Sequence, residues 1–257
     1  MDDHHMNLVK YKGLYVRKGL AVDKDMIRDC FRHYDKFGSK HSLKDAVVMD
    51  WGMNIGGFGH MMLQEPIKQY IGIEPHPDNF EVAKANLAHD PRAVLIQAAV
   101  TSSMKNLFNE PVDSIELYLT NSKQNYCSGT TNLKSKAAAR LRQTKIDVPA
   151  AQANELMEKY KPTHFKCDIE GEEYRIFDSW DWKFPECVKE MAVEFHWQDK
   201  ILTYENGWRS KILDNNFHPI YEDLNYVKGD TEFTWQNSPA PYRNIWGMDC
   251  FYEKRID

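Results

Sequence analysis

The sequence lacks the features that would place it in a membrane or in an oxidising compartment. No run approaches the ~20 consecutive apolar residues of a membrane-spanning helix, and the polar, acidic residues 1–5 are unlike a signal peptide. Its five cysteines are scattered, odd in number and never spaced Cys-x-x-Cys, which favours buried thiols over a disulfide framework. We therefore expect a cytoplasmic protein without a membrane span.

The chain also lacks an excess of positive charge. Its 33 Lys and Arg against 38 Asp and Glu leave a net charge of -5, which argues against nucleic acid or an anionic membrane as a partner. A local basic patch is still compatible with this balance. Basic residues are dense in residues 134–145, a segment that suits a solvated face or a contact with an anionic acceptor.

No Pro/Gly-rich linker, internal repeat or low-complexity segment divides the 257 residues. With 42% hydrophobic residues, such a chain can bury the core of one sizeable domain. We predict a single structural domain, with residues 1–45 as an N-terminal extension packed on a core of 46–257. The extension is predicted to hold a short strand at 14–16 and a helix over 25–37, with Asp23 as its cap.

From residue 46 onward, short apolar runs alternate with helical segments. Strands are predicted at 46–49, 70–73 and 94–96, with a helix over 78–88 before the third of them. This rhythm is that of a Rossmann-like α/β fold, a mostly parallel sheet with helices on both faces. Further elements are predicted from local patterns: strands at 115–119, 164–168, 191–196, 218–221 and 248–252, helices at 151–160 and 208–213, and a polar loop at 121–132.

The glycines after the first core strand do not have the Gly-x-Gly-x-x-Gly spacing of a dinucleotide-binding loop. Asn54 stands where the second glycine would be, and Asp50 lies two positions before Gly52. A carboxylate there would repel a pyrophosphate, but it suits a ligand with an ammonium and a sulfonium group, such as S-adenosylmethionine. An ordinary strand-to-helix turn, in which the glycines serve only the backbone, is the alternative.

A second acid, Glu74, ends the second core strand. A carboxylate at that place can accept hydrogen bonds from both ribose hydroxyls of an adenosine, in a dehydrogenase or in a methyltransferase. Alone it is a weak signal, because many strands end in an acid. Together with Asp50 it favours a cofactor that contains a nucleoside.

Four acids follow the fourth core strand, where an open parallel sheet binds its ligands. Asp168 and Glu170 are candidates for a general base, a metal ligand or a substrate contact. Glu172 and Glu173 equally suit the first turn of a helix, whose dipole favours negative charge.

The fifth core strand ends in Glu194-Phe195-His196. Alternation places Glu194 and His196 on the same side of the strand. A histidine on a strand is more often a structural residue than a catalyst. The expected position of His196 beside Asp168 favours a functional role.

At these residues the sequence resembles the FkbM family of methyltransferases. The family shows a strand ending in Asp-x-Gly-Ala-Asn-x-Gly, a strand ending in Glu-Pro, an Ala-Val pair, a Lys-x-Asp-x-Glu-Gly-x-Glu block and a Glu-x-His. Here these motifs are Asp50–Gly56, Glu74-Pro75, Ala99-Val100, Lys166–Glu173 and Glu194–His196. Trp51 and Met53 stand where smaller residues are usual, so the cofactor pocket is expected to be reshaped there.

The resemblance implies a class I methyltransferase fold and transfer of a methyl group from S-adenosyl-L-methionine to a hydroxyl. The favoured acceptor is a sugar hydroxyl of a glycan or glycoconjugate, and a polyketide-type or other small-molecule hydroxyl is the alternative. The resemblance places the cofactor against ten residues: Asp50, Gly52, Asn54, Gly56, Phe58, Glu74, Pro75, Ala98, Ala99 and Asp168. His196 or Asp168 is the expected base, Glu170 and Glu194 would orient the acceptor or the imidazole, and no metal is assigned, although a divalent ion on Asp168 and Glu170 is an alternative.

Two readings from other classes compete with a methyltransferase. A nicotinamide-dependent oxidoreductase is disfavoured by the missing glycine spacing and by Asp50. A non-catalytic module that keeps the nucleotide pocket is disfavoured by the acids at 168–173 and by the Glu-x-His.

Overall fold

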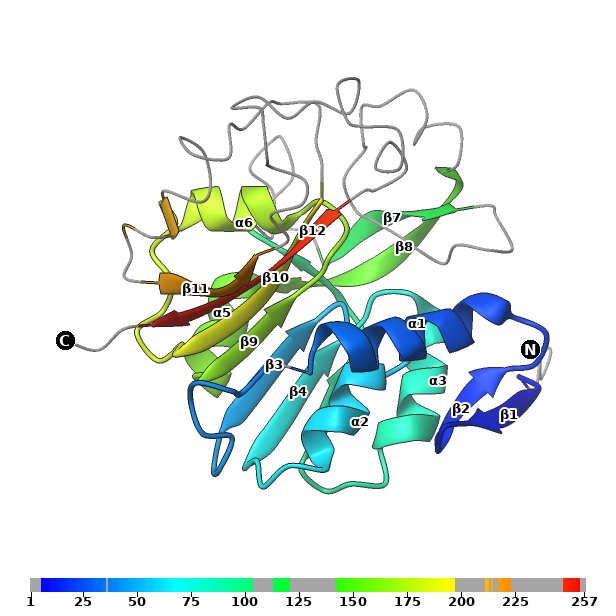
Figure 1. Ribbon diagram of the computed structural model, residues 1–257. Coiled ribbons are helices and arrows are strands. Elements are labelled where there is room, and N and C mark those ends of the chain that lie inside the picture. Colours follow the sequence, from blue (N-terminus) through cyan, green and yellow to red (C-terminus); the bar gives the residue numbers. More distant parts are fainter. Residues whose placement is uncertain are drawn as a thin grey trace, which may run out of the picture.

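The computed structural model begins with an N-terminal hairpin and helix that lie against the core (Figure 1). The hairpin pairs β1 (Leu8–Tyr11) with β2 (Leu14–Arg17), and α1 (Ala21–His33) follows directly. The structure describes residues 6–35, 37–103, 113–120, 142–196, 211–212, 214, 217–222 and 247–254.

One seven-stranded sheet forms the centre of the described chain. Its spatial order is β11-β12-β10-β9-β3-β4-β5, and the five strands from β10 to β5 pair in parallel. Only β12 runs against both of its neighbours. The strands are β3 (Val47–Trp51), β4 (Gln69–Ile73), β5 (Ala93–Ile96), β9 (His164–Cys167), β10 (Glu190–His196), β11 (Phe217–Glu222) and β12 (Gly247–Lys254).

This sheet confirms the predicted Rossmann-like architecture. The chain proceeds from β3 through β4 to β5 on one side and then returns to β9 and β10 on the other. The strand order therefore reverses between β3 and β9, and ligands of open α/β sheets bind outside the carboxyl ends of the strands at such a point.

Helices cover both faces of the sheet, as Figure 1 shows. The alternation of buried residues along β3 assigns each face its helices: Val48 packs in a cluster with Phe58 of α2, whereas Trp51 packs in a cluster with Phe177 of α6. Apolar burial on both faces is what makes the parallel strands read as near-continuous apolar runs. The helices are α2 (Gly57–Leu63), α3 (Pro77–Leu87), α5 (Ala153–Tyr160) and α6 (Glu173–Ser179).

A second, three-stranded sheet follows β5. In it β8 (Arg142–Gln152) pairs in parallel with β6 (Ala99–Thr101) and antiparallel with β7 (Ser114–Thr120). The strand predicted at 115–119 is confirmed as β7, but β8 was not predicted. Ile146 and Val148 do alternate with exposed neighbours there, but the basic residues of the segment and Pro149 obscured the strand pattern.

The predicted N-terminal helix is present but shifted. It begins at Ala21 rather than at residue 25, it ends at His33, and its N-cap is Leu20 rather than Asp23. Asp23 instead lies in the first turn, where its carboxylate accepts bonds from the backbone N and the side chain of Arg17 at 2.7–3.0 Å. The carboxylate thus fastens the hairpin to the helix.

The remaining predicted core elements are confirmed as β3, β4, α3, β5, α5, β9, β10, β11 and β12. The polar loop at 121–132 lies outside the described residues, as do most of the helix predicted at 208–213 and most of the basic segment. The division at residue 45 stays a prediction. No helix in the described part of the chain is long and apolar enough to cross a membrane.

Candidate active site

Two adjoining cavities open at the carboxyl ends of the central strands, at the reversal between β3 and β9. Their empty volumes, which include space open to solvent, are about 590 and about 900 Å³. We call them the first and the second cavity. They share a wall formed by Met26, Gly52, Asn54, Asp168 and Glu170.

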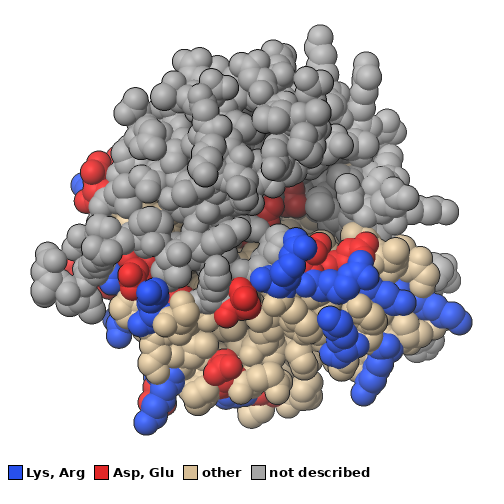
Figure 2. All heavy atoms as spheres, in the orientation of Figure 1, with Lys and Arg blue, Asp and Glu red and all other residues tan. Residues whose placement is uncertain are grey.

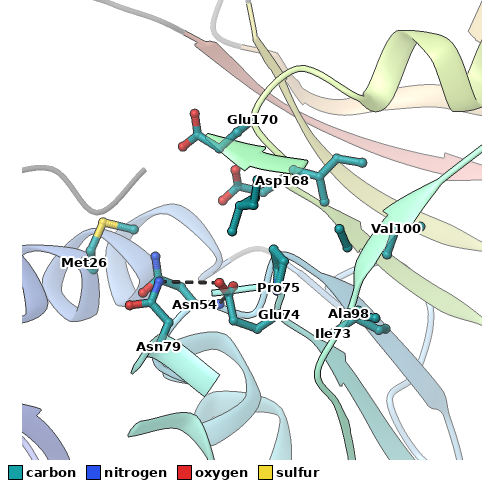
Figure 3. Close-up of a pocket in the computed structure, with 14 residues that line it drawn as sticks. Met26, Asn54, Ile73, Glu74, Pro75, Asn79, Ala98, Val100, Asp168 and Glu170 are labelled. Atoms are coloured by element: carbon teal, nitrogen blue, oxygen red, sulfur yellow. Dashed lines mark hydrogen bonds between the residues drawn. The ribbon is translucent and has the colours of Figure 1, made fainter. Parts of the chain in front are cut away.

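Glu74 forms the polar floor of the first cavity. Its Oε2 accepts the backbone N–H of Asn54, and its Oε1 accepts that of His76, both at 2.9 Å. Burial raises the pKa of this carboxyl to about 7, although these hydrogen bonds oppose the rise. Figure 3 shows Glu74 and Asn79 on one side of the cavity, with Asp168 and Glu170 opposite them.

The other walls of the first cavity combine small residues with residues from the second sheet. Pro75, Ala98 and Ala99 line it, as the resemblance implied, together with Val100 of β6 and Leu117 of β7. Small side chains in this wall leave room for a flat ring beside the carboxylate. The second sheet thus completes a cavity that the strand ends alone would leave open.

The N-terminal hairpin supports this cavity from behind. The Nη2 of Arg17 donates to Asp23 at 2.7 Å and to the Oδ1 of Asn79 at 2.9 Å. The Nδ2 of Asn79 in turn lies 3.5 Å from the Oε1 of Glu74. All four side chains are buried, so the extension is connected to the cavity floor by a continuous polar network.

The two glycines predicted to hold the cofactor are both required by the protein itself. Gly52 has φ +79, and a Cβ there would lie 1.8 Å from the carbonyl oxygen of Asp168, so no other residue allows β9 to end so close to β3. Gly56 has φ +90, and its Cβ would meet Leu87 of α3 at 2.9 Å. Gly52 lines both cavities, whereas Gly56 is in the wall of neither.

Asp50 lies beneath the cleft rather than in its wall. It is fully buried and is absent from the lining of both cavities. Its Oδ2 accepts the hydroxyl of Tyr70 at 2.6 Å, and its Oδ1 accepts the ammonium of Lys166 at 3.0 Å. The negative charge that the sequence suggested for a cationic ligand is therefore matched by a lysine of the same chain.

The acids of the fourth strand divide into two pairs. Asp168 and Glu170 line both cavities. Glu172 is the N-cap of α6 and Glu173 its first residue, and the Oε1 of Glu173 accepts the N–H of Ile169 at 3.1 Å. For Glu172 and Glu173 the helix-turn alternative is therefore confirmed.

The fifth strand brings Glu194 to the second cavity, beside Asp168 and Glu170. His196 is the last residue of β10, where its backbone pairs with Gly247 of β12. The side chain of His196 lies outside what the structure describes. Its proposed role as the base therefore stays a prediction.

The second cavity is bounded on its outer side by α1. Met26 and Cys30 line it from that helix and Tyr34 from the C-cap of the helix, and Phe58 of α2 lines it as well. Helix α1 itself was predicted from the sequence, but no part in the site was predicted for its side chains, which recur every three to four residues. Met53 also lines the cavity, whereas Trp51 packs in the opposite core, so only one of the two unusual residues reaches the cleft.

Lys166 lines the second cavity, although no role was predicted for it from the sequence. It lies on β9, two positions before Asp168, and alternation alone would have placed the two side chains on one side of that strand.

Among the residues that the structure describes, no group of three or more His, Cys, Asp or Glu side chains is arranged to hold a metal ion.

The family described as the methyltransferase FkbM domain matches residues 50–220 of the chain. None of the curated proteins matches the sequence. Among solved structures, TYW2 of M. jannaschii in complex with AdoMet is 12% identical, with 96% of this chain and 86% of that chain covered and a TM-score of 0.45. The precorrin-6y C5,15-methyltransferase of Geobacter metallireducens is 10% identical, with 93% and 92% covered and a TM-score of 0.42.

Proposed function

The chain belongs to the FkbM methyltransferase family, and we propose that it methylates a hydroxyl oxygen, that of a sugar in a glycan or glycoconjugate. The family makes it an S-adenosylmethionine-dependent methyltransferase of the class I fold. The family does not identify the methyl acceptor, so the acceptor is the part that we propose. One observation supports it above the others: a second cavity lined by acids and aromatic rings adjoins the cavity that suits the methyl donor.

The first cavity fits S-adenosylmethionine in this proposal. Glu74 would accept the ribose hydroxyls, and the small residues Ala98 and Ala99 would face the adenine. If His196 is the base, the carboxylate of Asp168 on the opposite wall suits the ammonium of the methionine part. Gly52, which allows no Cβ, brings the backbone against the same space.

The second cavity would receive the acceptor. Asp29, Asp168, Glu170 and Glu194 line it, and among its described lining residues Lys166 alone is basic. Carboxylates accept hydrogen bonds from hydroxyl groups, but they repel phosphate and carboxylate groups at close range. This charge balance supports a neutral polyol rather than an anionic acceptor.

The outer surface supports the same expectation about partners. Figure 2 shows Lys and Arg side chains mixed with Asp and Glu over α1 and the hairpin. Mixed charge of this kind is a poor match for the continuous phosphate backbone of a nucleic acid. We keep nucleic acid out of the proposed acceptors for this reason, and a cytoplasmic location stays our proposal from the scattered cysteines.

The chain must supply deprotonation and alignment. Bound S-adenosylmethionine supplies a methyl group that its sulfonium already activates. Asp168 or His196 would take the proton from the acceptor hydroxyl, a step typically worth ~10²–10⁴-fold in rate. Glu170 and Glu194 would hold the acceptor oxygen in line, or orient the imidazole if His196 is the base.

A polyketide-type hydroxyl remains the second candidate, because Met26 and Ile27 give the second cavity an apolar side. A panel assay with labelled S-adenosylmethionine separates the candidates. Neutral glycosides should be methylated, and the same sugars carrying a phosphate should not be. Methylation confined to apolar alcohols would replace the sugar proposal, and loss of activity with a chelator would point to a metal on Asp168 and Glu170.

A further inference from the structure

Lys166 is a buried ammonium that the reaction as described so far does not use. Its side chain is 5% exposed, and its Nζ lies 3.0 Å from the Oδ1 of Asp50, 3.0 Å from the carbonyl oxygen of Gly52 and 3.5 Å from the Oδ2 of Asp168. An ammonium has three donors, and three acceptors surround this one. Burial lowers the pKa of Lys166, but the carboxylates of Asp50 and Asp168 outweigh it and raise the pKa above its ordinary value.

The three acceptors belong to different parts of the site. Asp50 lies in β3 beneath the cleft, Gly52 begins the turn after β3, and Asp168 follows β9 on the far wall. Lys166 therefore joins the two strand ends between which the strand order reverses. Its contacts with the rings of Tyr34 and Phe58, at 5.6 and 6.0 Å, extend the same junction to the wall of the second cavity.

Asp50 is held in turn by Tyr70, whose hydroxyl donates to its Oδ2 at 2.6 Å. Burial and the neighbouring Asp50 raise the pKa of Tyr70, so this hydroxyl keeps its proton. One carboxylate oxygen of Asp50 accepts a hydrogen bond from Tyr70 and the other accepts one from Lys166, so both oxygens are bound by side chains of the protein. A buried ion pair of this kind seldom adds net stability over an apolar pair, so its presence favours a role in the site.

We propose that Lys166 is a positioning residue for the methyl donor: its ammonium holds the Asp168 carboxylate and the Gly52 carbonyl in the places from which they face the donor. Asp50 acts through Lys166 and not on the donor itself. The proposal concerns only the binding of S-adenosylmethionine, so its test needs no acceptor. It can fail while the sugar proposal stands, and the reverse also holds.

The experiment compares three variants by calorimetry with S-adenosylmethionine and by thermal unfolding without it. Lys166→Met leaves Asp50 buried without its cation, so we expect a loss of stability and about tenfold or more weaker donor binding. Asp50→Asn keeps an acceptor for Tyr70 and should weaken binding less. The double variant removes both charges; it should regain stability but still bind the donor as weakly as Lys166→Met does.

A matched control removes another lysine–carboxylate pair. Lys84 and Glu81 lie 2.7 Å apart on the exposed side of α3, and Lys84→Met with Glu81→Gln should bind the donor as the parent does. If Lys166→Met and the double variant do not fold, Lys166→Arg replaces them in the binding experiment. It keeps the positive charge, but a guanidinium cannot place one nitrogen on all three acceptors. This variant should fold and bind weakly.

Three results would overturn the proposal. Parent-like affinity in the double variant would make Lys166 a purely structural residue. Losses from Lys166→Met and Asp50→Asn that add in the double variant would make Asp50 an independent, direct ligand. Parent-like affinity in Lys166→Arg would show that only the charge matters and not the three contacts.

Discussion

Buried polar side chains have different surroundings at the amino ends and at the carboxyl ends of the central strands. At the amino ends, Glu190 of β10 accepts the backbone N–H groups of Gly38 and His41 at 2.6 and 3.2 Å. His164 of β9 donates its Nε2 proton to the carbonyl of His41 at 3.2 Å. These groups bind the chain segment that leads into β3, and they are enclosed by it.

At the carboxyl ends, the polar groups of the same strands face cavities. Glu194 of β10 and Asp168 beyond β9 line the cleft. The comparison separates buried polar groups that bind the backbone around them from buried polar groups that also face a cavity.

The largest expected effect is on the rate, at the carboxyl end. Asp168→Asn should lower methyl transfer about 10²–10⁴-fold if Asp168 is the base, and His196→Ala should do so if His196 is. Full activity in both variants would exclude both residues, as measured with the acceptor that the panel identifies.

Donor affinity is expected to show the next largest effect. Glu74→Gln weakens the bonds to the ribose hydroxyls, and we expect S-adenosylmethionine to bind about tenfold to a hundredfold more weakly by calorimetry. The unliganded variant should be less stable than the parent, because Gln has one acceptor oxygen and leaves one of the two backbone N–H groups that Glu74 binds without its acceptor. Unchanged affinity would remove Glu74 from the cofactor site.

A substitution at the amino end should have the opposite signature. Glu190→Ala leaves the N–H groups of Gly38 and His41 without their acceptor, so the free energy of unfolding should fall by about 1–3 kcal/mol. Chemical denaturation measures this loss, and donor affinity of the folded variant should equal that of the parent. A weakened donor site in Glu190→Ala would break the division between the two ends.

The smallest effect is a difference in how stability depends on pH. Burial raises the pKa of Glu74 from 4.5 to about 7, so between these values the folded protein holds a proton that the unfolded chain has lost, and stability falls as pH rises. Burial lowers the pKa of His164 from 6.5 to about 4, so there the unfolded chain binds the extra proton and stability rises with pH.

The two slopes oppose each other over pH 4.5–6.5, by about 1 kcal/mol per pH unit at most for each group. Over this range, Glu74→Gln should make stability rise more steeply with pH than in the parent, and His164→Gln should make it rise less. Unfolding in urea at several pH values measures both. Equal slopes in the two variants would contradict the opposite pKa shifts of Glu74 and His164.

The local sequence determined the order of the core elements and the place of the cleft. Apolar runs that end in Asp50, Glu74 and Asp168 predicted parallel strands whose carboxyl ends meet, because burial on both faces requires such runs. Gly52 after Asp50 predicted a ligand beside the first core strand, with an ordinary strand-to-helix turn as the alternative. Each of these signals occupies only a few consecutive residues, so it could be read without any tertiary contact.

Only the tertiary structure decided which polar groups face the cavity and which face one another. Asp50 and Lys166 are 116 residues apart in the chain, and their pairing follows from the contact of β3 with β9. Nothing local distinguishes Asp50, which is matched by a lysine, from Glu74, which lines a cavity. The same holds for β8, whose pairing with β7 and β6 makes a strand of a segment that looked basic and polar. Charge and hydrogen-bonding partners at these positions come from distant parts of the chain, and distance along the chain is what a local pattern cannot span.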